Sequence, residues 1–230
     1  MFFDPMYLLV MLPGMALSLW ASFKVKSTFN KYSQVRPRSG MTGAEAARAL
    51  LKRAGISQVS VEPVQGFLSD HYDPSARALR LSPDVYHGAS LSALGVAAHE
   101  AGHAIQHADG YAPLKFRSLV VKPAGIGQSG GMLVATAGIF FQSPAMTWLG
   151  IILFSAFLAF TLVTLPVEFN ASSRAVRVLG DAGIITRQEV PGTRAVLNAA
   201  ALTYVAAAIS ALMQLLYLLM RAGVLGGRQE

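Results

Sequence analysis

The chain has 230 residues, of which 53% are hydrophobic and 13% charged, well below the roughly 25% charged residues of ordinary soluble domains. This composition indicates a membrane protein of one or two domains. The formal net charge is +7, but the basic residues lie beside apolar segments, so we interpret them as determinants of membrane topology and expect no nucleic-acid partner. The absence of cysteine excludes disulfides and thiolate chemistry, which leaves His, Asp and Glu as candidate metal ligands.

The first apolar segment, residues 6–23, contains Pro13 and Gly14 and predicts an N-terminal transmembrane anchor. Its length is near the lower limit for a membrane span, which needs about 20 residues. A cleaved signal peptide is the rival interpretation. It is disfavoured because five basic residues and no acid follow the segment between positions 24 and 39, whereas no charged n-region precedes it.

The next part of the chain, residues 24–118, reads as a domain outside the membrane, with a small β element between two helices. Thr42 and Glu45 form a capping-box pattern that predicts the start of the first helix. The turn signal Asp73-Pro74 separates two of the three expected strands. The predicted helices are 44–53 and 91–108, and the predicted strands are 59–63, 67–72 and 78–82.

Three further apolar stretches, residues 124–141, 145–165 and 195–220, predict a helical membrane bundle. The first is weak in hydropathy, but its small residues suit close helix packing, and the link at 142–144 allows only a tight hairpin. The expected fold is therefore mainly α with a small β element and about four transmembrane helices. Its expected parts are an anchor (1–23), a cytoplasmic domain (24–118) and a helical bundle (119–230) that includes a loop at 166–194.

The distribution of Lys and Arg predicts the orientation of these spans. Five basic residues lie in 24–39 and four in 166–194, whereas the 142–144 hairpin has none. The positive-inside rule therefore places 24–118 and 166–194 in the cytoplasm and both termini on the opposite side.

The segment His99-Glu100-Ala101-Gly102-His103 matches the H-E-x-x-H pattern within a predicted helix. Residues four apart lie on the same helix face, so His99 and His103 can bind one Zn²⁺. Glu100 is then placed to accept a proton from a metal-activated water as general base. The pattern also arises by chance on exposed helices, but the flanking residues are apolar or small, which indicates a buried helix. Gly102 leaves room for a close helix neighbour.

A third protein ligand is needed, and two acids are candidates. Asp109 occupies the position of the last metzincin ligand, but that pattern requires a glycine where this chain has Gln106. Glu168 follows directly after the strongest predicted span, where an acid at a membrane boundary suggests a functional role, although a simple interfacial charge is the alternative. We favour Glu168.

Four short segments carry a resemblance to a known family. They read S-D-H-Y-D-P at 69–74, L-S-P-D-V-Y at 81–86, A-A-H-E-A-G-H-A-I-Q at 97–106 and L-P-V-E-F at 165–169. In these segments the chain resembles the YugP-like neutral zinc metallopeptidases of bacterial membranes, and its plan is similar to that of the HtpX-type membrane proteases. The resemblance extends over nearly the whole chain.

This resemblance implies a cytoplasmic zincin-like domain in the bacterial inner membrane, with a gluzincin-type site. The site would hold one zinc ion per chain through His99, His103 and Glu168, with Glu100 as base. One departure concerns the position two residues after the third ligand, where the resemblance leads us to expect Asp and this chain has Asn170. The amide can still form a hydrogen bond but supplies no charge.

Other residues have weaker predicted roles. His71 and Tyr72 either stabilise an oxyanion during catalysis or pack around the turn at Asp73-Pro74. His107 is expected to support the site or lie at the surface. Arg174 could orient a carboxylate or carbonyl, but a solvated cytoplasmic arginine is the favoured interpretation. The strand at 78–82 is a candidate edge for pairing with an extended substrate.

The favoured function is a zinc metalloendopeptidase that cleaves membrane or membrane-proximal proteins. The alternative is a non-catalytic or latent zinc-binding scaffold or adaptor, which Glu100 disfavours because a structural zinc site needs no base. A transporter is disfavoured because the spans contain almost no charge. The expected partners are the lipid bilayer, protein or peptide substrates, and either another membrane protein or further copies of the chain.

Overall fold

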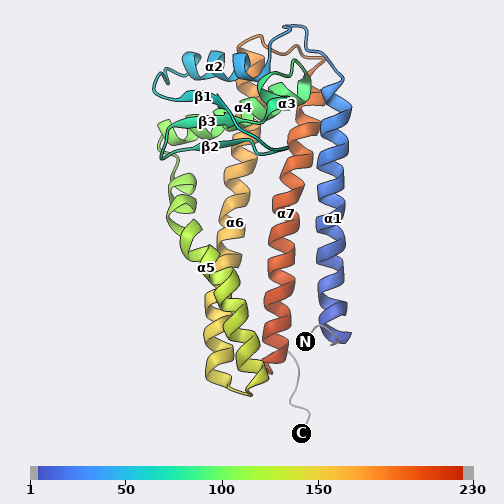
Figure 1. Cartoon of the computed structure of the whole chain (residues 1–230), viewed down its shortest axis with the longest axis vertical. Helices are drawn as coiled ribbons and strands as arrows, with labels where there is room; N and C mark the ends of the chain where they lie inside the picture. The colour runs from blue at the N-terminus through green and yellow to red at the C-terminus, as the bar shows by residue number, and fades with distance from the viewer. Residues whose placement is uncertain (1–4, 225–230) are drawn as a thin grey trace. The chain divides into compact units, whose positions relative to one another are not determined.

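The computed structural model describes residues 5–224; residues 1–4 and 225–230, which include both ends of the predicted topology, lie outside the described part. Seven helices and three strands make up the described chain (Figure 1). They are α1 (Pro5–Ser33), α2 (Gly43–Arg53), β1 (Ser60–Pro63), β2 (His71–Asp73), β3 (Ala78–Leu81), α3 (Pro83–Tyr86), α4 (Leu91–Ala108), α5 (Ala112–Phe140), α6 (Pro144–Asp181) and α7 (Val190–Arg221). The prediction of a mainly helical fold with a small β element is confirmed.

Three helices of the described chain, α1, α6 and α7, are long and apolar enough to cross a membrane. The prediction of about four spans is therefore wrong, because the fourth expected span, 124–141, lies in α5. That part of α5 contains five glycines together with Gln128 and Ser129, which lower its hydropathy below that of a typical span.

The chain divides into two compact units. The first, which we call the helical unit, contains Met1–Ala21, Phe116–Pro166 and Thr203–Glu230. The second, the sheet-containing unit, contains Ser22–Lys115 and Val167–Leu202. The helices α1, α6 and α7 each contribute residues to both units.

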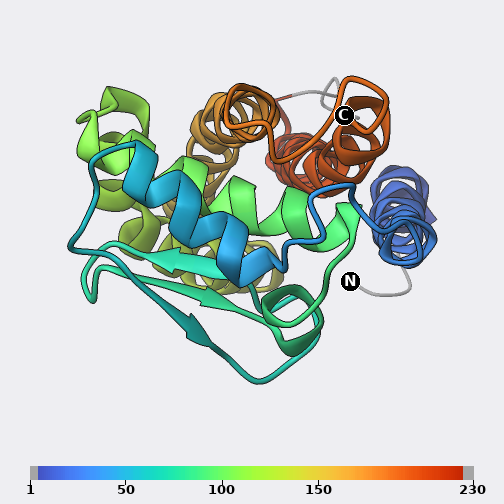
Figure 2. The ribbon, with the colours of Figure 1, turned by 90° about the horizontal axis from the view of Figure 1, so that it is seen from above.

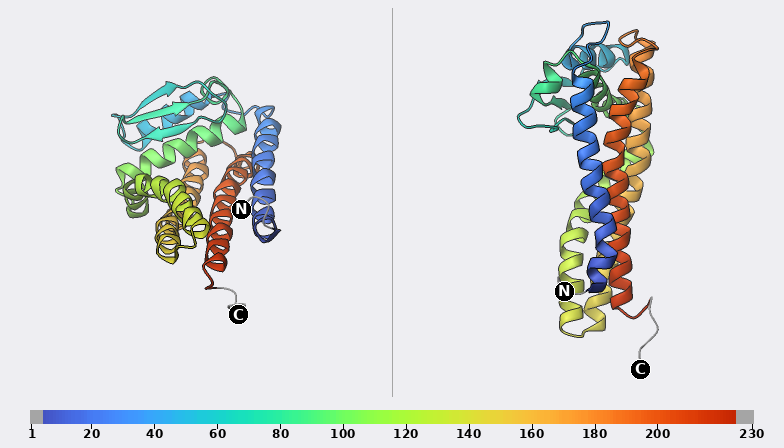
Figure 3. Two further views of the ribbon diagram at one scale, coloured as in Figure 1. Left: turned by 60° about the horizontal axis from the view of Figure 1, so that its bottom comes forward. Right: turned by 90° about the vertical axis from the view of Figure 1, so that its right-hand side faces the viewer.

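In the helical unit, α5 and α6 form a tight antiparallel hairpin, as the short link predicts (Figure 3). Glycines make this close approach possible. A methyl group on Gly150 would lie 2.2 Å from the backbone nitrogen of Ala135, and one on Gly138 would lie 2.4 Å from that of Thr147. The expectation that small residues here serve close helix packing is confirmed.

The sheet-containing unit begins with α2, which starts at the predicted capping box. The Thr42 hydroxyl accepts a hydrogen bond from the Glu45 amide, and the Glu45 carboxylate accepts one from the Thr42 amide. The helix buries its apolar face against α4 (Figure 2). Buried aliphatic residues of the sheet, α3 and α4 complete this core: Leu79, Leu81, Val85 and Leu94.

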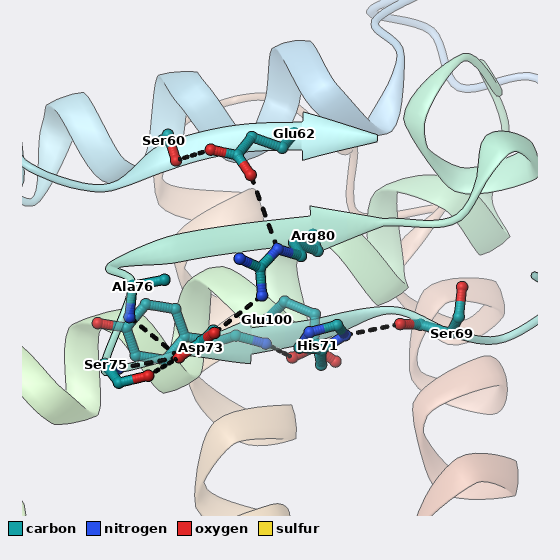
Figure 4. A network of polar contacts seen from close by, with 10 residues as sticks. Ser60, Glu62, Ser69, His71, Asp73, Ser75, Ala76, Arg80 and Glu100 are labelled. Carbon is teal, nitrogen blue, oxygen red and sulfur yellow. Dashed lines mark hydrogen bonds and ion pairs between the residues drawn. The ribbon is translucent and has the colours of Figure 1, made fainter. Parts of the chain in front are cut away.

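The three strands form one sheet with the order β1-β3-β2, in which β1 is parallel and β2 antiparallel to β3. The turn between β2 and β3 falls at the predicted Asp73-Pro74 signal. Hydrogen bonds from the Ser75 hydroxyl, the Ala76 amide and Arg80 hold the pKa of Asp73 well below its usual range. Figure 4 shows Arg80 of β3 reaching both Asp73 of β2 and Glu62 of β1, so this arginine ties the three strands together.

Three details differ from the sequence-based expectations. The strand expected at 67–72 is shorter and shifted, since β2 spans only His71–Asp73. Strand β3 is the central strand, so the prediction that 78–82 forms an edge is wrong; β1 and β2 are the edges. The segment 166–194 is largely helical, because α6 continues through Pro166 to Asp181 and α7 begins at Val190. A proline removes one backbone donor from a helix, but the packed surroundings of α6 maintain the helix beyond it.

The hairpin of α5 and α6 yields a prediction about stability. Replacing Gly150 with Ala should lower the free energy of unfolding by about 1–3 kcal/mol, because the added methyl group cannot fit against Ala135. The matched control is Gly125→Ala, which has open space around it and should raise helix stability by about 0.5–1 kcal/mol. Thermal unfolding in one detergent measures both changes. Equal effects of the two substitutions would contradict the packing.

Candidate metal centre

The helix α4, which carries the H-E-x-x-H pattern, is held in the core of the sheet-containing unit. The Ser90 hydroxyl caps its N-terminus by accepting from the Ala93 amide. Two residues later the buried Ser92 hydroxyl donates to the carbonyl oxygen of Phe29. Most residues of α4 are buried, so its orientation, and with it the direction of His99 and His103, is fixed by packing. The expectation of a buried helix is confirmed.

Gly102 brings α4 into contact with α6. A methyl group at Gly102 would lie 2.9 Å from the carbonyl oxygen of Ala171, closer than real side-chain contacts. The close neighbour that the sequence predicts for Gly102 is therefore α6. This approach places the first turn after Pro166 opposite the two histidines.

The side chains of His99, His103 and Glu168 converge, with one potential ligand atom of each lying within 4.8 Å of the others. The Glu168 Oε2 atom is 3.1 Å from His99 Nε2 and 3.5 Å from His103 Nε2. Glu168 is only 1% exposed and His103 only 7%. A carboxylate buried to this degree requires charge compensation, and a divalent cation between the three groups would supply it.

A chain of hydrogen bonds determines which nitrogen of His103 faces this centre. Arginine has only donors, so Arg174 Nε donates to Asn170 Oδ1, which also accepts from Gln106 Nε2. Gln106 Nε2 donates as well to the carbonyl oxygen of Val167, so its Oε1 is left to accept from His103 Nδ1 at 3.0 Å. His103 therefore carries a proton on Nδ1. In the neutral ring this leaves the Nε2 atom, which faces Glu168, with its lone pair free for a cation; in the protonated ring Nε2 donates to Glu168 instead.

His99 is oriented in the same way from the other side. Its Nδ1 lies 3.1 Å from the Ser172 hydroxyl, which can accept its proton and leave Nε2 to face Glu168. Ser172 lies one turn after Glu168 on α6, and Gln106 lies three residues after His103 on α4. The roles of Ser172 and Gln106 were not predicted from the sequence, although their one-turn spacing from a candidate ligand was the signal that could have revealed them.

The balance of charges around His103 favours its protonated form when no cation compensates the two acids. Burial by itself lowers the pKa of His103, but the hydrogen bond to Glu168 and the charges of Glu100 and Glu168 outweigh it, so the pKa is raised. The pocket thus attracts positive charge, as a cation site should.

Asp109, the rival third ligand, lies outside this group. It ends α4 as the C-terminal cap and pairs with Arg174. Arg174 is therefore engaged by both Asp109 and Asn170, so the expectation of a solvated surface arginine is wrong. Its role is to fix the side chain of Asn170.

The general-base candidate Glu100 is anchored to strand β2. Its Oε2 accepts a hydrogen bond of 3.0 Å from the backbone amide of Tyr72, and Figure 4 shows Glu100 beside this strand. Asp70 lies close enough to interact with it electrostatically. Burial raises the pKa of Asp70, against the hydrogen bonds that it accepts from Ser82, and the charge of Glu100 raises it further.

The side chains of His71 and Tyr72 lie in different environments. His71 is exposed, and its Nδ1 lies 2.8 Å from the carbonyl oxygen of Ser69. The Tyr72 hydroxyl lies 2.8 Å from His107 Nδ1, and burial raises the pKa of Tyr72. The structure therefore links Tyr72 and His107, while the Tyr72 backbone, which the sequence analysis did not consider, contacts Glu100.

Two imidazole nitrogens and one carboxylate oxygen form the donor set of catalytic zinc sites, which leave one position open for water or substrate. The orientations of His99 and His103 fit this role, because both Nε2 atoms face Glu168 and both Nδ1 atoms have partners on the outside. The residues present are therefore suited to hold such an ion.

Comparisons with known proteins agree with this geometry. The family model described as "Putative neutral zinc metallopeptidase" matches residues 7–223. The chain is 48% identical over 225 residues to "Putative membrane protease YugP" of Bacillus subtilis (strain 168), which covers 98% of this chain and 99% of that protein. No solved structure matches the chain. The resemblance inferred from the sequence motifs is confirmed, and the chain belongs to this neutral zinc metallopeptidase family.

Proposed function

We propose that this protein is a zinc-dependent metalloendopeptidase that hydrolyses peptide bonds in membrane or membrane-proximal proteins. The observation that carries the proposal is the convergence of His99, His103 and Glu168 around one point, with Glu100 next to His99 on the same helix. One zinc ion per chain, held by these three residues, would lower the pKa of a water molecule to about 7 and polarise a peptide carbonyl.

The residues of the chain prepare this chemistry. The Tyr72 amide holds one oxygen of Glu100, so the other carboxylate oxygen can accept a proton from the attacking water and later deliver it to the leaving amine. Gln106 and Ser172 keep His103 and His99 in the required tautomers. Burial of Glu168 and Gln106 keeps water away from the ligands and strengthens their electrostatic interactions.

Strand β2 offers a place for the substrate. In the described sheet β2 pairs with β3 alone, and its Tyr72 amide bonds Glu100. An extended peptide that adds to the free edge of β2 would run past Glu100, and main-chain hydrogen bonds would align its scissile bond. His71, exposed at the start of β2, would then lie beside the bound peptide and stabilise the oxyanion.

The protein's setting follows from its apolar helices and its basic loops. The relative in Bacillus subtilis is named a membrane protease, and three helices of the described chain can cross a membrane. Since His99, His103 and Glu168 converge, 24–118 and 166–194 would lie on one side of the membrane, and the hairpin of α5 and α6 would enter and leave the membrane from that side. The excess of Lys and Arg in 24–39 and 166–194 supports a location in the bacterial inner membrane with that side, and the active site, facing the cytoplasm. Membrane or membrane-proximal proteins are then the accessible substrates.

Metal analysis tests the ligand set. Purified wild-type protein should contain about one zinc ion per chain. Each of the substitutions Glu168→Gln, His99→Ala and His103→Ala should lower the affinity for zinc by more than about 100-fold, because loss of a residue that only supports a ligand already lowers it by about 10–100-fold. The matched control is Asp109→Asn, which removes the rival acid and should leave the zinc content near one. Elemental analysis after dialysis against a chelator measures the difference. Zinc loss in Asp109→Asn with retention in Glu168→Gln would overturn the assignment.

The role of Glu100 is tested separately from metal binding. Glu100→Gln should retain zinc but lower peptidase activity by about 10²–10⁴-fold, because an amide cannot accept the proton of water. Glu62→Gln, which removes an acid from strand β1, is the control and should keep its activity. Cleavage of an unfolded membrane-protein substrate by reconstituted protein provides the assay. Full activity in Glu100→Gln would remove this residue from the mechanism, and a zinc-loaded wild type without activity would support the scaffold.

The orientation of His103 is tested through Gln106. Gln106→Leu keeps the side-chain volume but removes the acceptor for His103 Nδ1. It also removes one of the two hydrogen bonds that Asn170 Oδ1 accepts, so that only the one from Arg174 is left. Zinc affinity should fall about 10–100-fold, as measured by competition with a fluorescent chelator. Ser172→Ala should have a smaller effect, because its site is only partly buried and water can replace the hydroxyl. Unchanged affinity in Gln106→Leu would show that the hydrogen-bond chain does not orient the ligand.

A further inference from the structure

A groove between α6 and α7 in the sheet-containing unit has no role in the proposed hydrolysis. Its volume is about 410 Å³, within the range of small-molecule sites. Both helices contribute to its walls. The residues that matter below are Phe169, Ser172 and Arg177 from α6, and Arg194, Leu197 and Asn198 from α7.

The two arginines of this groove carry uncompensated charge. Arg177 and Arg194 are exposed, and neither forms a hydrogen bond or an ion pair with another residue between positions 5 and 224. Other arginines of the same unit are paired: Arg174 with Asp109, and Arg80 with Asp73. Two cations on facing helices repel each other across a shared groove, so an anion bound between them would be stabilised by both.

The groove also has an apolar end. Phe169 lies two residues beyond Val167, the last residue of the uncharged run in α6, and its side chain is 46% exposed. On α7, Arg194 directly precedes the uncharged run that begins at Ala195. The groove therefore lies where both candidate membrane helices leave their apolar stretches, the depth at which lipid headgroups occur.

We propose that this groove binds the headgroup of an anionic phospholipid. The guanidinium groups of Arg177 and Arg194 donate to the phosphate oxygens, for which their forked geometry is suited. Asn198 hydrogen-bonds the remaining headgroup, and Phe169 contacts the first part of an acyl chain. Basic pockets between membrane helices bind such headgroups in general. Free phosphate could bind to the same arginines but would leave Phe169 exposed. A phospholipid contacts both the arginines and Phe169, so we favour it as the ligand.

The groove adjoins the metal centre without sharing its ligands. Ser172 lines the groove, and its hydroxyl contacts His99 Nδ1. A bound headgroup would therefore lie next to the residue that orients His99, one of the proposed metal ligands. Neither arginine contacts His99, His103 or Glu168. Lipid binding can therefore be measured without peptidase activity and is independent of the proposed function.

The test uses the full chain in a neutral detergent, to which phosphatidylglycerol or phosphatidylcholine is added. Phosphatidylglycerol should raise the melting temperature of the wild type more than phosphatidylcholine does. In the double variant Arg177→Gln/Arg194→Gln, phosphatidylglycerol should bind about 30-fold more weakly. The control Arg53→Gln/Arg187→Gln changes the net charge equally at exposed positions outside the groove and should bind like the wild type.

Three results would overturn the proposal. If the Arg177→Gln/Arg194→Gln variant and the wild type bind phosphatidylglycerol equally well, the groove is not the binding site. If the control variant loses as much affinity as the groove variant, the net charge of the protein, and not the groove, determines the binding. Protection by inorganic phosphate at the same phosphate concentration would exclude the lipid as the ligand. If the double variant unfolds, the single substitution Arg194→Gln replaces it, with an expected loss of about fivefold.

Discussion

The close approach of α4 and α6 at Gly102 is the constraint on which the metal centre depends. The two histidines are adjacent by local helix geometry, but the third donor comes from a residue 69 positions after His99. Only the absence of a side chain at Gly102 lets the backbone of Ala171 come close enough for Glu168 to reach both Nε2 atoms. A residue that is not itself a candidate ligand thus sets the geometry of all three candidate ligands.

The direction of the hydrogen bonds explains how Asn170 can stand where the resemblance led us to expect an acid. Asn170 does not contact a histidine; its oxygen accepts from Gln106 and Arg174. Because Arg174 can only donate, the orientation of both amides follows, and Gln106 must accept from His103. Fixing the tautomer needs an acceptor in the right place and does not need a negative charge. The negative charge that is missing at position 170 is therefore not needed, because Arg174 holds the side chain of Asn170 in the required orientation.

Small residues have two consequences in this chain, and they explain why the sequence suggests one span too many. The glycines of α5 allow a tight hairpin with α6, which is a property of membrane helices, but they also lower the hydropathy that identifies a span. In the sheet-containing unit, the absence of a side chain at Gly102 likewise allows α4 and α6 to pack closely. Glycines in a helical sequence therefore indicate that another helix packs closely against that position, but they do not indicate which helix.

The sequence by itself determined the features that arise within a few residues along the chain. The capping box at Thr42, the turn at Asp73-Pro74 and the pairing of His99 with His103 one turn apart are local, so their patterns predicted them. Tertiary structure alone decided the strand order and the roles of Gln106 and Asn170, and it separated Asp109 from the ligands that Glu168 joins. Apart from the strand order, these outcomes depend on contacts between segments 60 or more residues apart, where packing of whole elements, and not the spacing of residues, determines which side chains meet.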